Sequence, residues 1–260
     1  MPEPLEISKN SEESPGIVLV TPVWKDSRRL GRYGPELARA LADFPHPVRW
    51  IIADDGSGTE EQKRLEGLRD DLARVHRDIE THFAEKHVGK GGVIHEAWAL
   101  APEAEWLAFV DADGSAPPED VLKIIGNSLK TGRTTLGIRK RTESTQLKET
   151  LWRGLAHRVF LLAVHLMIGL RRATDPQCGL KCINSADYRR VVAHLAESGL
   201  AFDSEMLAAL SRSGARWDEL PVNWVQMKGG KIHPARDAWP MLAALWRIRK
   251  RWQNTPRKEK

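Results

Sequence analysis

The chain has 260 residues, 41% of them hydrophobic, which is enough to bury the core of one large or two small domains and excludes disorder throughout. It contains no run of 18 apolar residues, and residues 1–15 are polar and acidic, so the sequence predicts neither a membrane-spanning helix nor a secretory signal. Two cysteines, Cys178 and Cys182, are too few for a disulfide framework or a metal quartet, and we therefore expect a cytoplasmic protein.

The net charge of +5 is unevenly distributed. Residues 139–172 and 236–260 each contain eight Lys or Arg against two acids, a net charge of +6 in each segment. Two basic segments on an otherwise acidic chain indicate an anionic partner: a phosphate ligand, a lipid surface or a nucleic acid. Solvated helix faces are the other explanation.

Residues 16–140 alternate short apolar runs with helical stretches. In chain order we predict a strand at 16–21, a helix at 35–42, a strand at 48–53, a helix at 60–77, a strand at 79–84, a helix at 92–100, a strand at 106–110, a helix at 118–129 and a strand at 134–138. Repeated βα units of this kind predict an α/β fold with a mostly parallel sheet and helices on both faces. Ligands then bind at the carboxyl ends of the strands.

The pattern becomes more helical after residue 145. We predict helices at 151–170, 185–197, 203–213 and 238–252, with a turn at 175–179 and a late strand at 220–226. No internal repeat or low-complexity linker divides the chain. The predicted organisation is therefore a disordered tail at 1–15, one domain at 16–235, and a basic amphipathic helix with its tail at 236–260.

Asp111 and Asp113 form the strongest candidate site. They are one residue apart and directly follow an apolar strand, Trp-Leu-Ala-Phe-Val. Two carboxylates at a strand end can bind a hard divalent cation together with phosphate oxygens. A solvated loop with an incidental pair of acids is the alternative.

Two glycine-containing turns could bind other parts of a nucleotide. Asp54 and Asp55 precede Gly-Ser, where a carboxylate can accept hydrogen bonds from a base or ribose, although such a sequence is often only a turn. Gly89 and Lys90 open a predicted helix, whose amides and cation suit a diphosphate. The spacing is not that of a Walker loop, and a flexible turn explains it equally well.

Three further acids lie in the second half of the chain. Asp175 belongs to a Pro-Gln-Cys-Gly turn, while Asp203 and Glu205 lie at a predicted helix start. Each could be a structural cap or a site acid, and for Asp203 alone capping is the better explanation.

Taken together, these motifs resemble a known family. Residues 21–26 (Thr-Pro-Val-Trp-Lys-Asp), 54–57, 89–91 and 111–114 are similar to the family 2 glycosyltransferases of GT-A fold. The second half narrows the resemblance to dolichyl-phosphate β-glucosyltransferases and their polyprenyl-phosphate relatives. This closer resemblance lies in four segments: Asp-Pro-Gln-Cys-Gly-Leu-Lys at 175–181, Phe-Asp-Ser-Glu at 202–205, residues 219–224 and residues 228–232.

The resemblance implies roles for the site residues. Pro22, Asp55 and Lys90, with Thr21, Asp54 and Gly89 in the same motifs, would bind the nucleotide. Asp111 and Asp113 would bind Mg²⁺ or Mn²⁺ and the ribose-diphosphate. Arg139 and Arg153 match arginines that meet phosphates, and Asp175 matches an acid near the reaction centre. A hydroxyl acceptor would need Asp175 or Asp203 as a base, whereas a phosphate acceptor would not.

The implied activity is inverting transfer of a hexose, glucose from UDP-glucose, to a polyprenyl phosphate, with a GDP-sugar as another possible donor. The same donor chemistry on a soluble hydroxyl acceptor is an alternative. A nucleic-acid-binding module is a remote one, because no nucleic-acid motif occurs. The chain departs from the family at Lys25-Asp26, where Asn-Glu is commoner, and at Ser115, which leaves the third metal ligand open. The sequence does not predict the oligomeric state.

Many relatives have transmembrane helices, so contact with a membrane would here depend on the protein surface. Residues 151–172 combine apolar bulk with flanking arginines, and Trp239, Leu242, Trp246 and Trp252 accompany a basic run at 247–251. Aromatic anchors with cations are typical of interfacial helices on anionic membranes. Helices packed on the sheet are the alternative.

Overall fold

The computed structural model describes residues 16–140, 142, 145, 147–148, 151–225, 227 and 234–253. Side chains are described for all of these except 147–148, 151–158, 234–238 and 253. The tail predicted at 1–15 lies outside the described residues.

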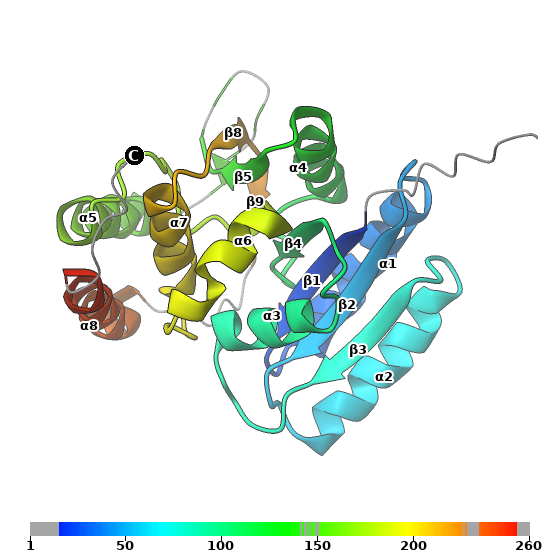
Figure 1. Cartoon of the computed structure of the whole chain (residues 1–260). Coiled ribbons are helices and arrows are strands. Elements are labelled where there is room, and N and C mark those ends of the chain that lie inside the picture. Colours follow the sequence, from blue (N-terminus) through cyan, green and yellow to red (C-terminus); the bar gives the residue numbers. More distant parts are fainter. Residues whose placement is uncertain are drawn as a thin grey trace, which may run out of the picture.

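A seven-stranded sheet forms the centre of the fold, in the order β3-β2-β1-β4-β7-β5-β8 (Figure 1). Its strands are β1 Ile17–Val23, β2 Val48–Asp54, β3 Ile79–Phe83, β4 Trp106–Val110, β5 Thr134–Ile138, β7 Leu180–Asn184 and β8 Trp217–Pro221. Parallel pairing joins β3 to β2, β2 to β1, β1 to β4, and β5 to β8. Within this sheet β7 runs antiparallel to both β4 and β5. The predicted mostly parallel sheet is confirmed.

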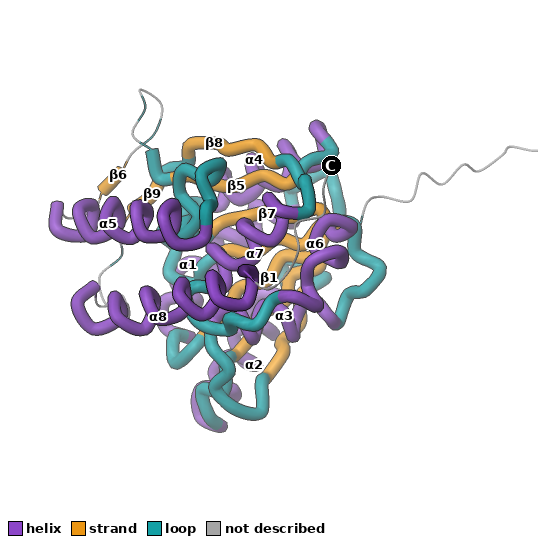
Figure 2. The backbone as a smooth tube through the Cα atoms, turned by 60° about the vertical axis from the view of Figure 1, so that its left-hand side comes forward, coloured by secondary structure: helices purple, strands orange, loops and turns teal. Residues whose placement is uncertain are grey.

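Helices cover both faces of this sheet. They are α1 Ser27–Ala42, α2 Thr59–Ala73, α3 Lys90–Ala99, α4 Pro118–Thr131, α5 Leu151–Ile168, α6 Ser185–Val191, α7 Phe202–Arg212 and α8 Pro234–Gln253, with a short 3₁₀ turn at Val192–His194. Two short strands, β6 Leu147–Lys148 and β9 Trp224–Val225, form a separate parallel pair. The helices α5 and α8 lie side by side at one end of the molecule in both views (Figures 1 and 2).

Two hydrophobic cores lie on opposite sides of the sheet, because successive strand residues point to opposite faces. In β1, Val18 and Val20 belong to the core that also contains buried residues of α3, α7 and α8. Ile17 and Leu19 belong to the core that contains buried residues of α1, α2 and α4. The sheet is therefore buried on both faces, and its strand ends are the part left for chemistry.

Several predictions for the individual elements were incomplete or wrong. The helix predicted at 35–42 begins earlier, at Ser27, and the short strand β6 was not predicted. The strand β7 was not predicted, because its buried Lys181 interrupts the apolar run. The strand predicted at 220–226 is divided between β8 and β9, and residue 226 lies outside the described residues. The helix predicted at 185–197 ends at Val191 and continues only as the short 3₁₀ turn.

The helix α8 packs against α5 and contributes to the core. Its inner side chains Ala244, Leu245, Ile248 and Trp252 are buried in the same cluster as α3 and α7. Trp252 is only 8% exposed, so the expectation that it faces a membrane is wrong. Across the described ranges, no helix combines the length and the apolar character needed to cross a bilayer.

An aromatic cluster connects α3 with α6 and α7. His95 of α3 stacks on Tyr188 at 5.7 Å between ring centroids and meets Phe202 edge-on at 5.8 Å. Nδ1 of His95 lies 2.7 Å from the hydroxyl of Tyr188. Burial lowers the pKa of His95 to about 4, so the imidazole is neutral in the folded protein at neutral pH.

We expect His95 to weaken the fold in acid. An unfolded histidine has a pKa of about 6.5. As the pH falls from there towards 4, the unfolded chain takes up a proton that the folded chain does not, and the free energy of unfolding decreases by up to about 3 kcal/mol. Urea unfolding at several pH values should therefore show a shallower decline for His95→Gln than for the parent chain. The control His194→Gln removes an exposed imidazole, and equal slopes for all three proteins would contradict the assignment.

Candidate active site

The predicted site residues come together at the carboxyl edge of the sheet. Thr21 lies near the end of β1, Asp54 ends β2, and Asp111 directly follows β4. The loop after β3 leads to Gly89, which is the N-cap of α3. Because parallel strands end on the same side, these four points lie along one edge of the sheet.

Asp55 joins the end of β2 to the loop that precedes α3. Its Oδ1 accepts hydrogen bonds from the backbone amides of Val88 at 2.6 Å and Gly89 at 3.0 Å. Its Oδ2 lies 2.9 Å from Nδ1 of His87. Burial raises the pKa of Asp55, although the two amides and His87 oppose the shift. Asp55 thus shapes the loop, and its contact with a nucleotide stays a prediction.

Thr21 and Asp54 are fully buried and support the same edge from inside. The hydroxyl of Thr21 accepts a hydrogen bond from Nε1 of Trp50 at 2.9 Å. Oδ2 of Asp54 accepts one from the amide of Ser57 at 3.0 Å, which fixes the turn after β2. Pro22, between Thr21 and the end of β1, is half-buried.

An aromatic pair that the sequence analysis did not assign lies beside this turn. Trp24 stacks on His87 with 4.6 Å between ring centroids and is 39% exposed. The next residue, Lys25, has a positive φ of 49°, and its amide donates to Oγ of Ser57 at 2.7 Å. The only sequence signal was Trp24 itself, in the Thr-Pro-Val-Trp motif. Its exposed ring offers a flat surface on which a base could stack.

Lys90 connects three elements at the start of α3. Its Nζ lies 2.6 Å from Oδ1 of Asp111 and 3.8 Å from Oδ2 of Asp203. Burial alone would lower the pKa of Lys90, but Asp111 and Asp203 outweigh it, so the pKa is raised and the ammonium stays charged. Lys90, the predicted diphosphate-binding cation, therefore lies against Asp111 and Asp203, two of the predicted site acids.

Asp111 and Asp113 lie in a partly desolvated position after β4. Oδ1 of Asp113 accepts a hydrogen bond from the amide of Ser115 at 2.9 Å, and Oδ2 lies 3.5 Å from a guanidinium nitrogen of Arg29. Burial and the neighbouring Asp111 raise the pKa of Asp113. The carboxylate of Asp111 packs against the α-carbon of Gly179 so closely that an added Cβ would lie 1.9 Å from its Oδ2.

These two acids fit a hard divalent cation. Their oxygens are the ligands that Mg²⁺ and Mn²⁺ prefer, and a cation between them would relieve the repulsion that raises the pKa of Asp113. Within the described part of the chain, no group of three or more His, Cys, Asp or Glu side chains could hold a metal. Asp111 and Asp113 would supply two carboxylates to such an ion, and the identity of a third protein ligand stays open.

Asp175 is tied to Arg139 across the same edge. Both oxygens of the carboxylate accept hydrogen bonds from the guanidinium, from Nε at 2.8 Å and from a terminal nitrogen at 2.8 Å. The guanidinium carbon lies 5.5 Å from the ring centroid of Trp224. The other predicted arginine, Arg153, belongs to α5, and its side chain lies outside the described residues.

Asp203 pairs with lysines instead of capping α7. Its Oδ1 lies 2.8 Å from Nζ of the fully buried Lys181, and no side-chain cap bond is made at the start of the helix. The expectation that Asp203 is a cap is therefore wrong. Nζ of Lys181 also donates to the carbonyl of Cys178 at 2.5 Å, beside the glycine that supports Asp111.

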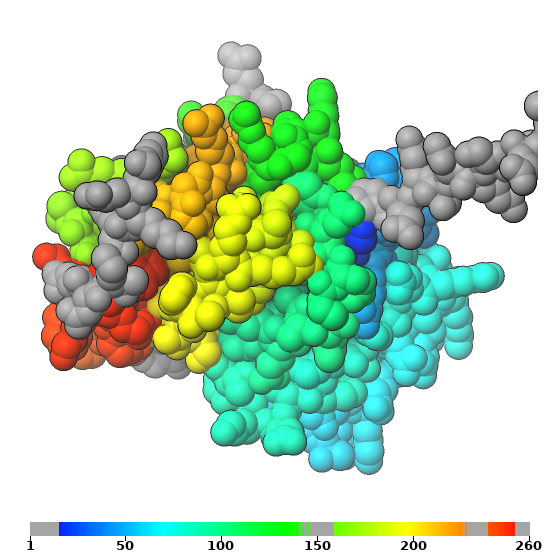
Figure 3. All heavy atoms as spheres, viewed as in Figure 1, coloured from blue at the N-terminus to red at the C-terminus, as the bar shows by residue number. Residues whose placement is uncertain are grey.

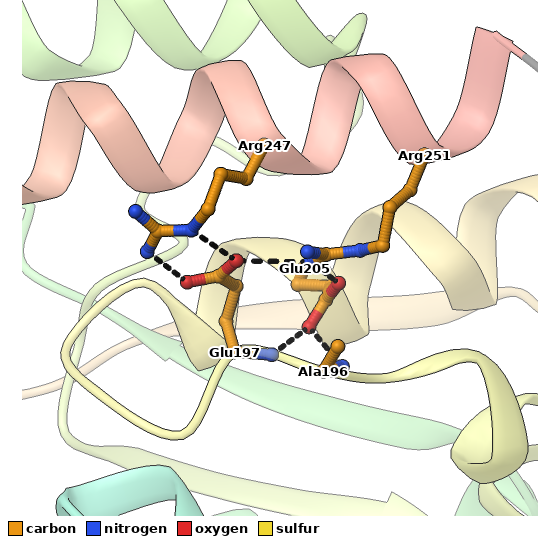
Figure 4. A network of polar contacts seen from close by, with 5 residues as sticks. All are labelled: Ala196, Glu197, Glu205, Arg247 and Arg251. Carbon is orange, nitrogen blue, oxygen red and sulfur yellow. Dashed lines mark hydrogen bonds and ion pairs between the residues drawn. The ribbon is translucent and has the colours of Figure 1, made fainter.

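Glu205, which the sequence offered as a cap or a site acid, organises a second layer behind the site (Figure 4). Its Oε2 accepts hydrogen bonds from the amides of Ala196 at 2.9 Å and Glu197 at 2.7 Å. Its Oε1 accepts one from Arg251 of α8 at 2.5 Å. The carboxylate of Glu197 in turn accepts hydrogen bonds from the guanidinium groups of Arg247 at 2.6 Å and Arg251 at 3.0 Å. Although burial raises the pKa of Glu197, these arginines outweigh it, and the pKa is lowered.

The loop at 196–199, which Glu205 supports, contacts the turn at 89–92 that is predicted to bind the diphosphate. The carbonyl of Ser198 accepts a hydrogen bond from the amide of Gly92 at 3.0 Å. A Cβ on Gly89 would lie 2.6 Å from the same carbonyl, and the positive φ of 92° also requires glycine there. A cavity of about 380 Å³ lies on the other side of this loop, lined by it and by α8.

We expect Glu205→Gln to loosen this layer. If the amide oxygen keeps the two backbone donors, the amide NH₂ faces the guanidinium of Arg251, which then has only the carboxylate of Glu197, at a cost of about 1–3 kcal/mol. Thermal unfolding should report the loss, and hydrogen exchange should be faster at 196–199 and at Gly92. The control Asp187→Asn removes an acid from a local ion pair with the exposed Arg190, three residues on in α6, and should change stability by less than about 1 kcal/mol. Unchanged exchange in Glu205→Gln would contradict this role.

Comparisons with solved structures identify the fold. Mannosyl-3-phosphoglycerate synthase from Rubrobacter xylanophilus matches with a TM-score of 0.63 and 15% identity, over 92% of this chain and 74% of that one. Glucosyl-3-phosphoglycerate synthase from Mycobacterium tuberculosis, in complex with Mn²⁺, UDP and phosphoglyceric acid, matches with a TM-score of 0.61 and 14% identity, over 94% and 80%. Both have the GT-A fold, so the predicted fold class is confirmed.

Comparisons with sequences identify the family. Dolichyl-phosphate beta-glucosyltransferase of Saccharomyces cerevisiae is 26% identical over 216 residues, which is 77% of this chain but only 64% of the yeast protein. The enzyme of the same name from Homo sapiens is 26% identical over 231 residues, covering 83% of this chain and 69% of the human protein. The profile of Glycosyl transferase family 2 matches residues 35–186, more than half of the chain. The chain therefore belongs to glycosyl transferase family 2.

Proposed function

We propose that the protein transfers glucose from UDP-glucose to a polyprenyl phosphate, with inversion at the anomeric carbon. The observation that carries the proposal is the arrangement of Asp111 and Asp113 beside Lys90 at the end of β4, in a member of a glycosyltransferase family. The names of the yeast and human relatives, dolichyl-phosphate beta-glucosyltransferase, support glucose as the sugar and a polyprenyl phosphate as the acceptor. UDP-glucose is an α-glycoside, so a β-linked product requires inversion.

The donor half of the site would bind the diphosphate through opposite charges. A Mg²⁺ or Mn²⁺ ion held by Asp111 and Asp113 would neutralise the departing nucleotide diphosphate. Structures of similar fold contain Mn²⁺ with UDP or with GDP-mannose, which supports the metal and leaves the base open. Lys90 adds a permanent positive charge, and the turn at Gly89 and Gly92 presents the amino end of α3.

The acceptor half favours a substrate that brings its own nucleophile. A hydroxyl acceptor needs a general base, and the two candidates are already engaged: Asp175 binds Arg139 through both oxygens, and Asp203 binds Lys181. A phosphate monoester is already an anionic nucleophile and needs a cation to bind it. Arg139, held in place by Asp175, is the arginine proposed to meet that phosphate with the donor positions that Asp175 does not occupy. This supports a polyprenyl phosphate over a soluble alcohol.

We expect Asp113→Asn to reduce transfer by about 100-fold or more, because it removes a carboxylate that would hold the metal at the leaving group. The measurement is transfer of radiolabelled glucose from UDP-glucose to a short-chain polyprenyl phosphate, with and without EDTA. The control Asp187→Asn should transfer at the parental rate. Absence of metal-dependent transfer by the parent chain would refute the activity, and full turnover by Asp113→Asn would refute the role of the acid.

Gly179→Ala should disable the site while leaving the fold intact. The three atoms nearest to the new Cβ all belong to the carboxylate group of Asp111, so we expect this side chain to move and the backbone to stay in place. Calorimetry should show weaker Mn²⁺-assisted binding of UDP with nearly unchanged thermal stability. Gly126→Ala in α4 is the matched control, because no atom lies within 4 Å of its added Cβ, and it should stabilise the protein by about 0.5–1 kcal/mol. Parental UDP binding by Gly179→Ala would contradict the placement of Asp111.

A further inference from the structure

Large exposed hydrophobic side chains gather on α5 and α8. Five of the nine such side chains in the described part of the chain lie on these two helices. They are Val159 at 62% exposure, Leu162 at 57%, Leu166 at 67%, Trp239 at 78% and Trp246 at 57%. Exposed apolar groups scattered singly need no explanation, but a concentration on neighbouring helices marks an interaction surface.

Each helix presents these residues as one stripe. Val159, Leu162 and Leu166 are spaced three and four residues apart, and Trp239 and Trp246 are seven apart, which places each set on one helix face. The opposite faces are buried, through Val164 in α5 and Leu245 in α8. The space-filling view shows the two helices adjoining at the left-hand end of the molecule (Figure 3). We call these five side chains with their flanking cations the α5–α8 surface.

The charge of this surface is strongly positive. Residues 151–172 and 239–252, which span all five exposed side chains, contain no Asp or Glu, and Asp237 is the one acid of α8. Arg171 and Arg172 follow α5, Arg249 and Lys250 lie on α8, and all four are exposed. The ammonium of Lys250 lies 5.3 Å from the ring centroid of Trp246, so the cation and the aromatic ring are presented together.

We propose that the α5–α8 surface docks on the anionic surface of a lipid bilayer. Leucine and tryptophan side chains would enter the headgroup boundary, and the exposed cations would contact anionic headgroups. The absence of acids from both segments fits a lipid surface of uniform negative charge. Docking on a bilayer requires neither the sugar donor nor the acceptor. It can therefore be tested independently of the proposed glucosyl transfer.

The test is co-sedimentation of the full chain with vesicles. We expect the chain to bind phosphatidylcholine vesicles in which about one lipid in three is anionic phosphatidylglycerol. Binding to vesicles of phosphatidylcholine alone should be weak. Trp239→Ser/Trp246→Ser should lower the partition coefficient by about tenfold or more, and Arg249→Gln/Lys250→Gln by a similar factor at low salt. Matched controls are Leu100→Ser, which alters an exposed apolar side chain at the end of α3, and Lys63→Gln/Arg74→Gln, which removes two exposed cations in and after α2.

Two outcomes would overturn the proposal. One is a parent chain that stays in the supernatant with anionic vesicles. The other is a surface that pairs with a second copy of the chain, seen as a dimer that becomes a monomer in Trp239→Ser/Trp246→Ser without any vesicle binding. Lipids with brominated chains give a second readout: they should quench tryptophan fluorescence in the parent and much less in Trp239→Phe/Trp246→Phe. UDP binding by every variant checks that it is folded.

Discussion

Lys90 lies between Asp111 at the end of β4 and Asp203 in the first turn of α7, and the site is organised around this contact. Asp203 also binds Lys181 of β7, so cations and anions alternate from the sheet into the helical layer. Buried charges are stable only when they are paired, and each member of the series therefore fixes the place of the next. The relative positions of four elements, β4, α3, α7 and β7, therefore depend on this series of charges.

This alternation also explains how the site could receive a charged donor. A divalent cation and a nucleotide diphosphate bring charges of opposite sign, and the protein offers two carboxylates to the first and an ammonium to the second. Asp55 and Asp54 hold the turns at this edge of the sheet, and Thr21 accepts a hydrogen bond from Trp50 of β2, while their contact with a nucleotide stays a prediction. The site thus combines charges that face a ligand with buried groups that hold the backbone around it.

The sequence was informative where local rules decide the structure. An apolar run that ends in an acid placed Asp111 and Asp113 at a strand end, and alternating βα units placed that end beside Lys90. It was uninformative where long-range pairing decides: β7 contains a lysine that only Asp203 makes acceptable in the core. The stack of Trp24 on His87 and the hydrogen bonds of Glu205 to the loop at 196–197 join segments that no spacing connects.

The helix α8 has two different sides. Its exposed side carries Trp239 and Trp246, while Arg247 and Arg251 reach inward to Glu197 and to the fully buried Glu205. Removing the helix would leave both carboxylates without their arginines, next to the loop that contacts Gly89 and Gly92. A chain shortened before residue 234 would therefore lose more than a peripheral helix. The loop at 196–199, which supports the turn at Gly89 and Gly92 expected to bind the donor, would lose the arginines that stabilise it.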